Sequence, residues 1–75
     1  MPTRTPEHRL GAAIKRRRQA KGLSQEHFAE RAGLHRTYVS QLERGLKSPS
    51  IRVVTRISAA LGCEPWVLIK EASRD

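Results

Sequence analysis

The sequence predicts an all-α fold, a compact domain of five short helices. Apolar residues recur every three to four positions in five segments, which is the spacing of the inward face of an amphipathic helix. Serine, glycine or proline residues separate these segments, and no stretch alternates apolar and polar residues as a half-buried strand does. A chain of 75 residues has material for one small core, so we expect a single domain.

The first helix is expected from about Glu7 to Lys21. Its inward face carries apolar residues at positions i, i+3 and i+4, which are Leu10, Ala13 and Ile14. The following residue, Gly22, tolerates the left-handed conformation that commonly ends a helix. An acidic residue at the start and a basic residue at the end also agree with the helix dipole.

Two very short helices joined by a glycine turn are expected next. Ser24 is a good N-cap for the first of them, and Gly33 ends it after about two turns. The second is expected from about His35 to Arg44, with Gly45 as its terminator. The inward residues of the pair are Phe28, Ala29, Ala32, Val39 and Leu42. Because the apolar stripe of the second helix is narrow, most of its surface is left for water or a partner.

The fourth helix is expected between an N-cap at Ser50 and a terminator at Gly62. Its apolar stripe consists of Ile51, Val54, Ile57 and Leu61, with Ala60 beside it. Pro65 suits the first position of a fifth helix, because the missing backbone N–H is not needed there. This last helix is expected to end at about residue 71.

The chain is strongly basic, with 15 Lys and Arg against 7 Asp and Glu and a formal net charge of +8 at pH 7. Such a surface attracts polyanions, which favours nucleic acid and leaves an anionic membrane surface as the alternative. No apolar run approaches the roughly 18 residues of a membrane span, and no signal peptide is indicated. The single cysteine excludes an intrachain disulfide. A cytoplasmic protein without a membrane partner is therefore expected.

The segments after the first helix are dense in short motifs. They are Leu-Ser-Gln at 23–25, Phe-Ala at 28–29, Ala-Gly at 32–33, Val-Ser-Gln-Leu-Glu-Arg-Gly at 39–45, Pro-Ser at 49–50 and Ala-Ala-Leu-Gly at 59–62. By these motifs the chain resembles, over roughly residues 10–69, the lambda-repressor and Cro-like helix-turn-helix family, the xenobiotic-response-element type of bacterial and phage regulators. The tripeptides at 36–38 and 42–44 are most similar to those of the short controller proteins of restriction–modification systems.

The resemblance implies a lambda-repressor-like domain that binds double-stranded DNA. Its expected parts are a flexible arm over 1–6, the domain over 7–71 with its helix-turn-helix at 24–45 and a dimerisation helix at about 65–71, and a tail over 72–75. No cofactor, metal ion or small-molecule effector is expected.

The resemblance also implies that the third helix lies in the major groove with its N-terminal part against base edges. The base-facing positions match Arg36, Thr37, Ser40 and Gln41. Arginine suits guanine, glutamine suits adenine, and threonine suits a thymine methyl group or a polar edge. Gln25 matches a position that touches the phosphate backbone and can brace the third helix. The further candidates for phosphate contacts are Tyr38, Arg17, Arg44, Lys47 and Ser48.

The basic run from Lys15 to Arg18 cannot form one patch on a helix. At about 100° per residue, its four side chains spread over about 300°. Arg17 is a candidate for a phosphate contact, with a merely solvated side chain as the alternative. For Arg18 the resemblance implies a different role, an internal ion pair with Glu43 that holds the first helix to the third.

Histidines and the cysteine do not indicate a metal site. His8, His27 and His35 fall on different elements, and none has a second ligand at the spacing of a zinc motif. We expect these histidines to be exposed or to cap helices, with a phosphate contact as an alternative for His35. Cys63 is expected to be a core thiol.

Trp66 departs from the family pattern, in which the fifth helix often begins Pro-Asp-Trp with an inward tryptophan. Here the order is Pro65-Trp66-Val67, which moves the indole one position round the helix. Val67 would then take the inward site, and an outward Trp66 with Leu68 and Ile69 would form a patch for self-association. The alternative is that the helix rotates and buries the indole in the monomer core.

The leading hypothesis is a homodimeric, sequence-specific transcription regulator on a pseudo-palindromic operator, as in controller proteins that regulate their own restriction–modification operon. A DNA-binding antitoxin is the alternative, although only Glu71 to Asp75 follow the fifth helix as a segment for a toxin. An enzyme is rejected, because no paired carboxylates, activated nucleophile or phosphate-cradling loop can be assembled. A basic membrane-surface peptide would fail to fold cooperatively in buffer without lipid.

Overall fold

The computed structural model describes residues 5–73, so most of the expected arm and the last two residues of the expected tail lie outside the described part. The described chain forms five α-helices and no strand, which confirms the all-α prediction. The helices are α1 (Pro6–Ala20), α2 (Gln25–Ala32), α3 (Arg36–Glu43), α4 (Ile51–Leu61) and α5 (Pro65–Ser73). None of them combines the length and the apolar character that crossing a membrane requires.

Side-chain caps begin three of the helices. The hydroxyl oxygens of Ser24 and Ser50 accept hydrogen bonds from backbone N–H groups three residues on, at 3.0 and 3.2 Å, as the sequence predicts. Thr5 caps α1 in the same way at 3.1 Å, with Pro6 in the first turn. Residues 5 and 6, which were expected in the arm, belong to the start of α1. At the other end, α5 continues to Ser73, two residues beyond the expected limit.

Two glycines are required by the fold, Gly33 for its backbone conformation and Gly11 for a close approach between helices. Gly33 adopts φ 71° and ψ 35°, the left-handed conformation that lets α3 follow α2 after a three-residue turn. Gly11 lies inside α1, where a Cβ atom would stand 2.7 Å from the backbone oxygen of Glu43 and closer still to that of Leu42. Glycine at this position lets α1 pass directly over the last turn of α3, a contact that the sequence does not indicate.

The core is one cluster to which every helix contributes. Its buried members are Leu10, Ala13, Ile14, Phe28, Ala29, Val39, Leu42, Val54, Ile57, Leu61 and Leu68. Ile51 was expected in the stripe of α4 but is 72% exposed, because it is the first residue of that helix and lies at a surface groove.

The orientation of α5 corrects a further expectation. Leu68 is fully buried, Val67 is half-buried and Trp66 is 62% exposed, so Leu68 rather than Val67 takes the inward site. α5 packs on α1 and α4, and this packing buries Leu68. Two positions along a helix differ by about 200°. Leu68 and Trp66 therefore point to opposite sides, and Leu68 is not part of an exposed self-association patch. Ile69 is about 60° from Trp66 and is 43% exposed.

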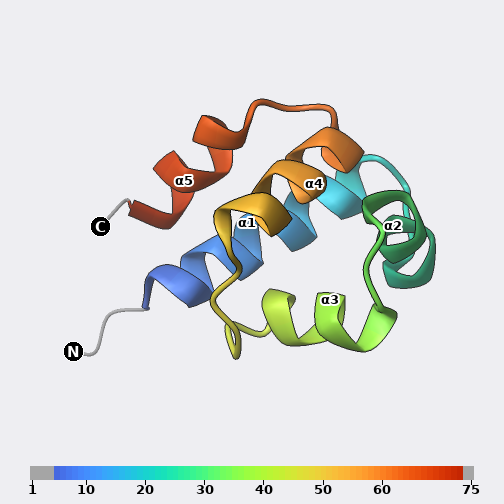
Figure 1. The fold of residues 1–75 in the computed structure, drawn as a ribbon, viewed down its shortest axis with the longest axis horizontal. Helices are drawn as coiled ribbons and strands as arrows, with labels where there is room; N and C mark the ends of the chain where they lie inside the picture. The colour runs from blue at the N-terminus through green and yellow to red at the C-terminus, as the bar shows by residue number, and fades with distance from the viewer. Residues whose placement is uncertain (1–4, 74–75) are drawn as a thin grey trace.

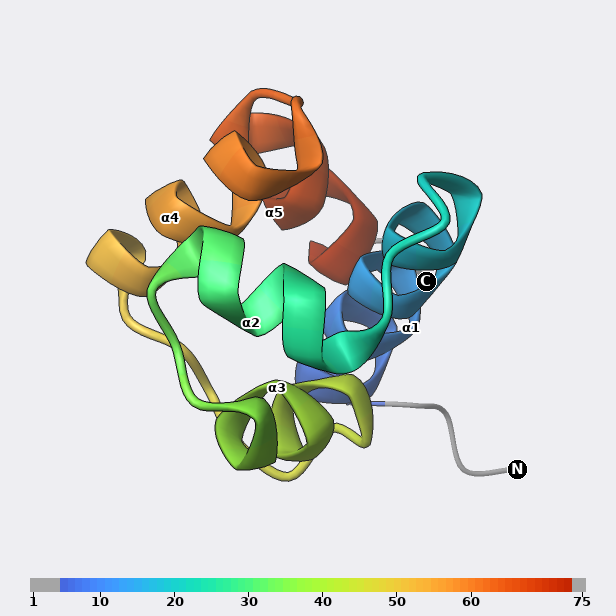
Figure 2. The ribbon, with the colours of Figure 1, turned by 90° about the vertical axis from the view of Figure 1, so that its right-hand side faces the viewer.

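α3 and α5 lie on opposite sides of the molecule (Figures 1 and 2). α1 contacts both of them, and α4 lies beside α1 in the middle of Figure 1. α2 packs on α3 and on α4. The outer surfaces of α3 and α5 therefore face in different directions.

Candidate nucleic-acid interface

The helix pair α2 and α3 is held in place by small and apolar residues at the crossing. Ala29 is 2% exposed where α3 passes, and the backbone N–H of Leu34 donates to its carbonyl oxygen at 2.8 Å across the turn. Phe28 and Val39 are completely buried, and Leu42 is 2% exposed. These side chains fix the angle between the two helices and the depth to which α3 sinks into the domain.

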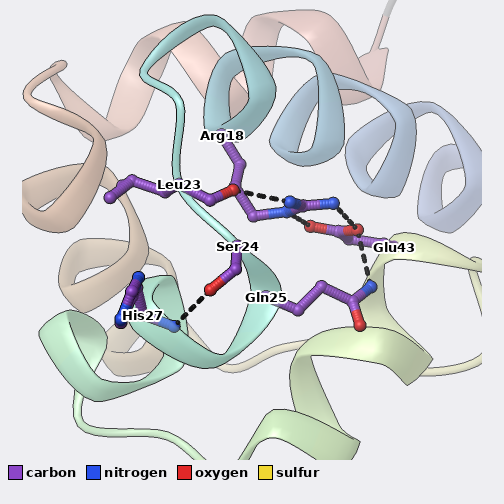
Figure 3. Close-up of polar contacts among 6 residues, drawn as sticks. All are labelled: Arg18, Leu23, Ser24, Gln25, His27 and Glu43. Atoms are coloured by element: carbon purple, nitrogen blue, oxygen red, sulfur yellow. Dashed lines mark hydrogen bonds and ion pairs between the residues drawn. The ribbon is translucent and has the colours of Figure 1, made fainter.

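A buried polar network fixes the C-terminal end of α3 (Figure 3). The guanidinium of Arg18 donates to both carboxylate oxygens of Glu43, at 2.6 and 3.0 Å, and to the carbonyl oxygen of Leu23 at 2.7 Å. The side chains of Arg18 and Glu43 are 9% and 3% exposed. This is the ion pair expected from the family resemblance, and its two parallel bonds are the strong, planar form of an arginine–carboxylate contact.

Gln25 extends this network to the start of α2. Its side-chain amide donates to Glu43 at 3.0 Å, while its backbone stands in the first turn, just after the Ser24 cap. One carboxylate therefore joins α1, α2 and α3, as the sticks in Figure 3 show. The amide oxygen of Gln25 has no part in this contact, and it is the atom that remains for outside partners.

The four residues expected to face bases share one side of α3. Counted at about 100° per residue from Arg36, they span about 140° of the helix, whereas the buried Val39 and Leu42 lie between about 240° and 300°. Arg36 and Thr37 are exposed, and the other two, Ser40 and Gln41, are half-buried. None of the four side chains makes a hydrogen bond or ion pair within residues 5–73. They form a polar face whose bonding capacity is unused.

The residues expected to contact phosphates come from α1, α2, α3 and the segment after α3. Gln25 is the first residue of α2. The exposed residues Arg44, Lys47 and Ser48 follow α3 in the chain. Arg17 is half-buried on α1, next to the buried Arg18. Tyr38 is also half-buried but packs against the core, so only part of its side chain faces outward.

Other residues singled out in the sequence have structural surroundings. His8 lies beside the Thr5 hydroxyl, with 3.0 Å between that oxygen and Nδ1, and its ring packs against Gly45. His35 is the N-cap of α3 but makes no side-chain capping bond, and Cys63 is half-buried against the core. Within residues 5–73, no group of three His, Cys, Asp or Glu side chains is placed to hold a metal ion.

The sequence did not indicate two arginine contacts that fasten α5 to α1. Arg16 forms an exposed ion pair with Glu71 at 2.9 Å, and Arg9 donates to the carbonyl oxygen of Ala72 at 2.9 Å. The partners are 55 and 63 residues apart in the chain, so no local pattern could have paired them. Because Arg16 is paired, only part of the basic run on α1 is available to an outside anion.

The geometry defines a helix-turn-helix unit with a free polar face, and the comparisons with known proteins give the same class. A helix-turn-helix family model matches residues 14–65, which is more than half of the chain. The chain belongs to the helix-turn-helix family, whose members described below are transcription regulators and not enzymes.

Two of the similar proteins are regulators of Bacillus species. The transcriptional regulator SinR of Bacillus subtilis is 38% identical over 63 residues, which are 83% of this chain and 57% of SinR. The control protein C.BamHI of Bacillus amyloliquefaciens is 41% identical over 61 residues, covering 80% of this chain and 75% of that protein. The chain thus spans little more than half the length of SinR but most of C.BamHI.

Solved structures of such proteins share the fold. The restriction-modification controller protein C.AhdI of Aeromonas hydrophila superposes with a TM-score of 0.81 at 39% identity, over 83% of this chain and 94% of that one. SinR, solved in complex with DNA, gives a TM-score of 0.76 at 38% identity, over 79% of this chain and 95% of the other. The chain therefore shares the fold of the helix-turn-helix domains of these regulators.

Proposed function

We propose that the protein is a sequence-specific transcription regulator that binds double-stranded DNA through α3. The observation that carries this proposal is the outward face of α3, which has free polar groups and is held rigidly by the Arg18–Glu43 network. In this arrangement α3 enters the major groove and reads base edges with Arg36, Thr37, Ser40 and Gln41. Phosphate contacts come from Gln25, Tyr38, Arg17, Arg44, Lys47 and Ser48.

The net charge and the similarity to known regulators support DNA as the partner. The net charge of +8 favours association with a polyanion, and neutralising phosphates releases counterions from the duplex. The likeness to SinR, whose structure was solved in complex with DNA, also supports a duplex as the partner. We place the protein in the cytoplasm of a bacterium or of a phage-infected cell, where such a duplex is accessible.

The regulator acts as a homodimer on a pseudo-palindromic operator. A helix of eight residues contacts only a few base pairs, so one copy has little discrimination between sequences. Two copies with their α3 helices about 34 Å apart enter successive major grooves and double the number of bases read. The exposed apolar residues of α5, Trp66 and Ile69, lie away from α3 and supply the surface for association.

The finer assignment is an autoregulatory controller of a restriction–modification operon. It is supported by the likeness to C.BamHI and to C.AhdI, which the chain matches over 75% and 94% of their lengths. In this role, occupancy of the operator follows the concentration of the regulator. As copies accumulate, mass action raises both the fraction of the regulator that is dimeric and the fraction of the operator that is bound.

Selection of bound sequences from a pool of random duplexes tests the proposal. The expected result is an enriched inverted repeat whose two half-sites lie about 10 base pairs apart, or a multiple of that spacing. Enrichment of a single, unrepeated site would contradict the homodimer, and no enrichment at all would contradict sequence-specific binding. Finding the selected site upstream of the protein's own gene, beside restriction and methyltransferase genes, would support the controller role.

A further inference from the structure

An apolar surface groove lies where the start of α1, the start of α4 and the end of α5 meet. It encloses about 160 Å³, and its lining includes Pro6, Leu10, Ile51, Ile69 and Ala72. The groove explains why Ile51 stays exposed although it follows the apolar period of α4. Ile51 and Ile69, 72% and 43% exposed, line the groove that runs between α4 and α5.

The other large exposed apolar residue on this side of the fold is Trp66. It is 62% exposed and precedes Ile69 by three residues on α5, so the two side chains lie about 60° apart on the same face. A tryptophan left in water forgoes the burial of about 150–250 Å² of surface, and such a side chain is a frequent centre of protein interfaces. The chain therefore presents an aromatic side chain and, one turn further on, an apolar groove.

We propose that Trp66 of a second copy of this chain occupies the groove, and that the two copies exchange this contact symmetrically. A two-fold axis beside Ile69 pairs the two α5 helices in antiparallel orientation, because isologous contacts are reciprocal. Residue 66 of one copy then stands opposite residue 72 of the other, three positions on either side of 69. Ala72 lines the groove, and its short side chain leaves room for an indole.

Size and charge both favour this occupant. An apolar cavity of about 150 Å³ accommodates a benzene molecule, so the groove of about 160 Å³ has room for the six-membered ring of the indole. The charged residue among the groove's lining is acidic, Glu7. The segment that would enter carries the exposed Lys70 four residues after Trp66, on the same side of α5. In a chain of net charge +8, this local pairing offsets repulsion between the two copies.

The inference rests on the homodimer proposed above, and the single tryptophan of the chain reports on it directly. Trp66 emission and its quenching by acrylamide are measured while the protein is concentrated, with association followed by sedimentation. The expected result is a blue shift and reduced quenching that follow dimer formation.

Ile51→Glu is expected to raise the dimer dissociation constant on the order of a hundredfold, because two symmetric contacts are lost together. Leu46→Glu, at an exposed leucine that is not part of the groove lining, is the matched control and should change neither readout.

Mixing variants tests the exchange itself. A Trp66→Ala chain keeps its groove, and an Ile51→Glu chain keeps its tryptophan, so a mixed dimer retains one of the two contacts that each homodimer lacks. The mixture should therefore associate more strongly than either variant alone. A wild-type dimer whose Trp66 stays as exposed as in the monomer would overturn the inference and leave the homodimer standing. Absence of a dimer at all concentrations, with and without the selected duplex, would overturn both.

Discussion

Replacing Arg18 by alanine is expected to destabilise the domain severely. The substitution leaves Glu43, whose side chain is 3% exposed, without its charge partner, and it removes the donor to the carbonyl oxygen of Leu23. Breaking a buried pair from one side typically costs about 3–5 kcal/mol, because the remaining charge stays desolvated. A chain of 75 residues has a total stability of roughly 4–11 kcal/mol, so the variant would lose a large part of its margin.

The exposed ion pair between Arg16 and Glu71 provides the matched control. Its bond length is 2.9 Å, but the side chains are 63% and 27% exposed, so Arg16→Ala should cost about 1 kcal/mol or less. A second variant, Arg18→Met with Glu43→Leu, replaces the buried pair by apolar side chains and should recover most of the lost stability. The assay is urea unfolding followed by circular dichroism, with equal slopes confirming that midpoints can be compared.

Arg18 would not be structural if Arg18→Ala unfolded at the same urea concentration as Arg16→Ala and yet bound DNA more weakly than the wild type. Arg18 would then act on the duplex and not on the positioning of α3. Equal destabilisation by Arg18→Ala and by the double substitution would also contradict the role of the ion pair, because the cost would then come from lost packing and not from an unpaired carboxylate.

Three further substitutions test base reading, phosphate contact and the packing of α1 on α3. Arg36→Ala should reduce the binding free energy for the selected duplex by about 1–3 kcal/mol and relax the preference at one base pair. Binding to a series of single-base variants of the duplex measures both effects. An equal loss on every duplex would show that Arg36 does not read a base. Lys47→Ala should weaken binding to all sequences alike. It should also reduce the magnitude of the slope of the logarithm of the DNA-binding constant against the logarithm of the salt concentration by about 0.9. An unchanged slope would argue against a phosphate contact. Gly11→Ala should destabilise by about 1–3 kcal/mol in thermal unfolding, because its Cβ would collide with the backbone oxygens of Leu42 and Glu43; the usual stabilising effect of alanine inside a helix, about 1 kcal/mol, would contradict that close approach.

Local chemistry explains why much of the fold could be predicted. The caps at Ser24 and Ser50 and the stop at Gly33 follow from hydrogen bonding and backbone freedom within a few residues. The core stripes of α1 to α3 follow from helical spacing alone. The ion pair of Arg18 with Glu43 is a long-range contact, and it could be anticipated only because the motifs resemble a known family.

What the sequence could not supply is the rotation of a helix about its own axis. In α5, Trp66, Val67, Leu68 and Ile69 are all apolar, so periodicity does not choose the inward residue. Packing on α1 and α4 makes that choice, and it buries Leu68. The closeness of α1 to α3 at Gly11 is likewise a tertiary fact, because nothing in the neighbouring sequence distinguishes a glycine that permits contact from one that weakens a helix.

The candidate site divides along the same line. The outward face of α3 could be predicted, because its four polar residues are spaced for one side of a helix and the apolar ones for the other. The role of Gln25 as a link to Glu43 depends on where α2 begins relative to the end of α3, which only the assembled domain determines. The groove beside Ile69 combines residues from three helices and a loop, so no single stretch of sequence predicts it.

We expect α3 to present the surface that reads DNA. The most direct measurement is a titration of the isotope-labelled protein with the selected duplex, followed by amide chemical shifts in NMR spectra. The largest changes are expected in residues 36–41, with smaller ones at Gln25 and in the loop at 44–48, and little change is expected along α5 beyond that caused by dimerisation. Changes centred on the exposed basic residues of α1, with residues 36–41 unaffected, would contradict this expectation.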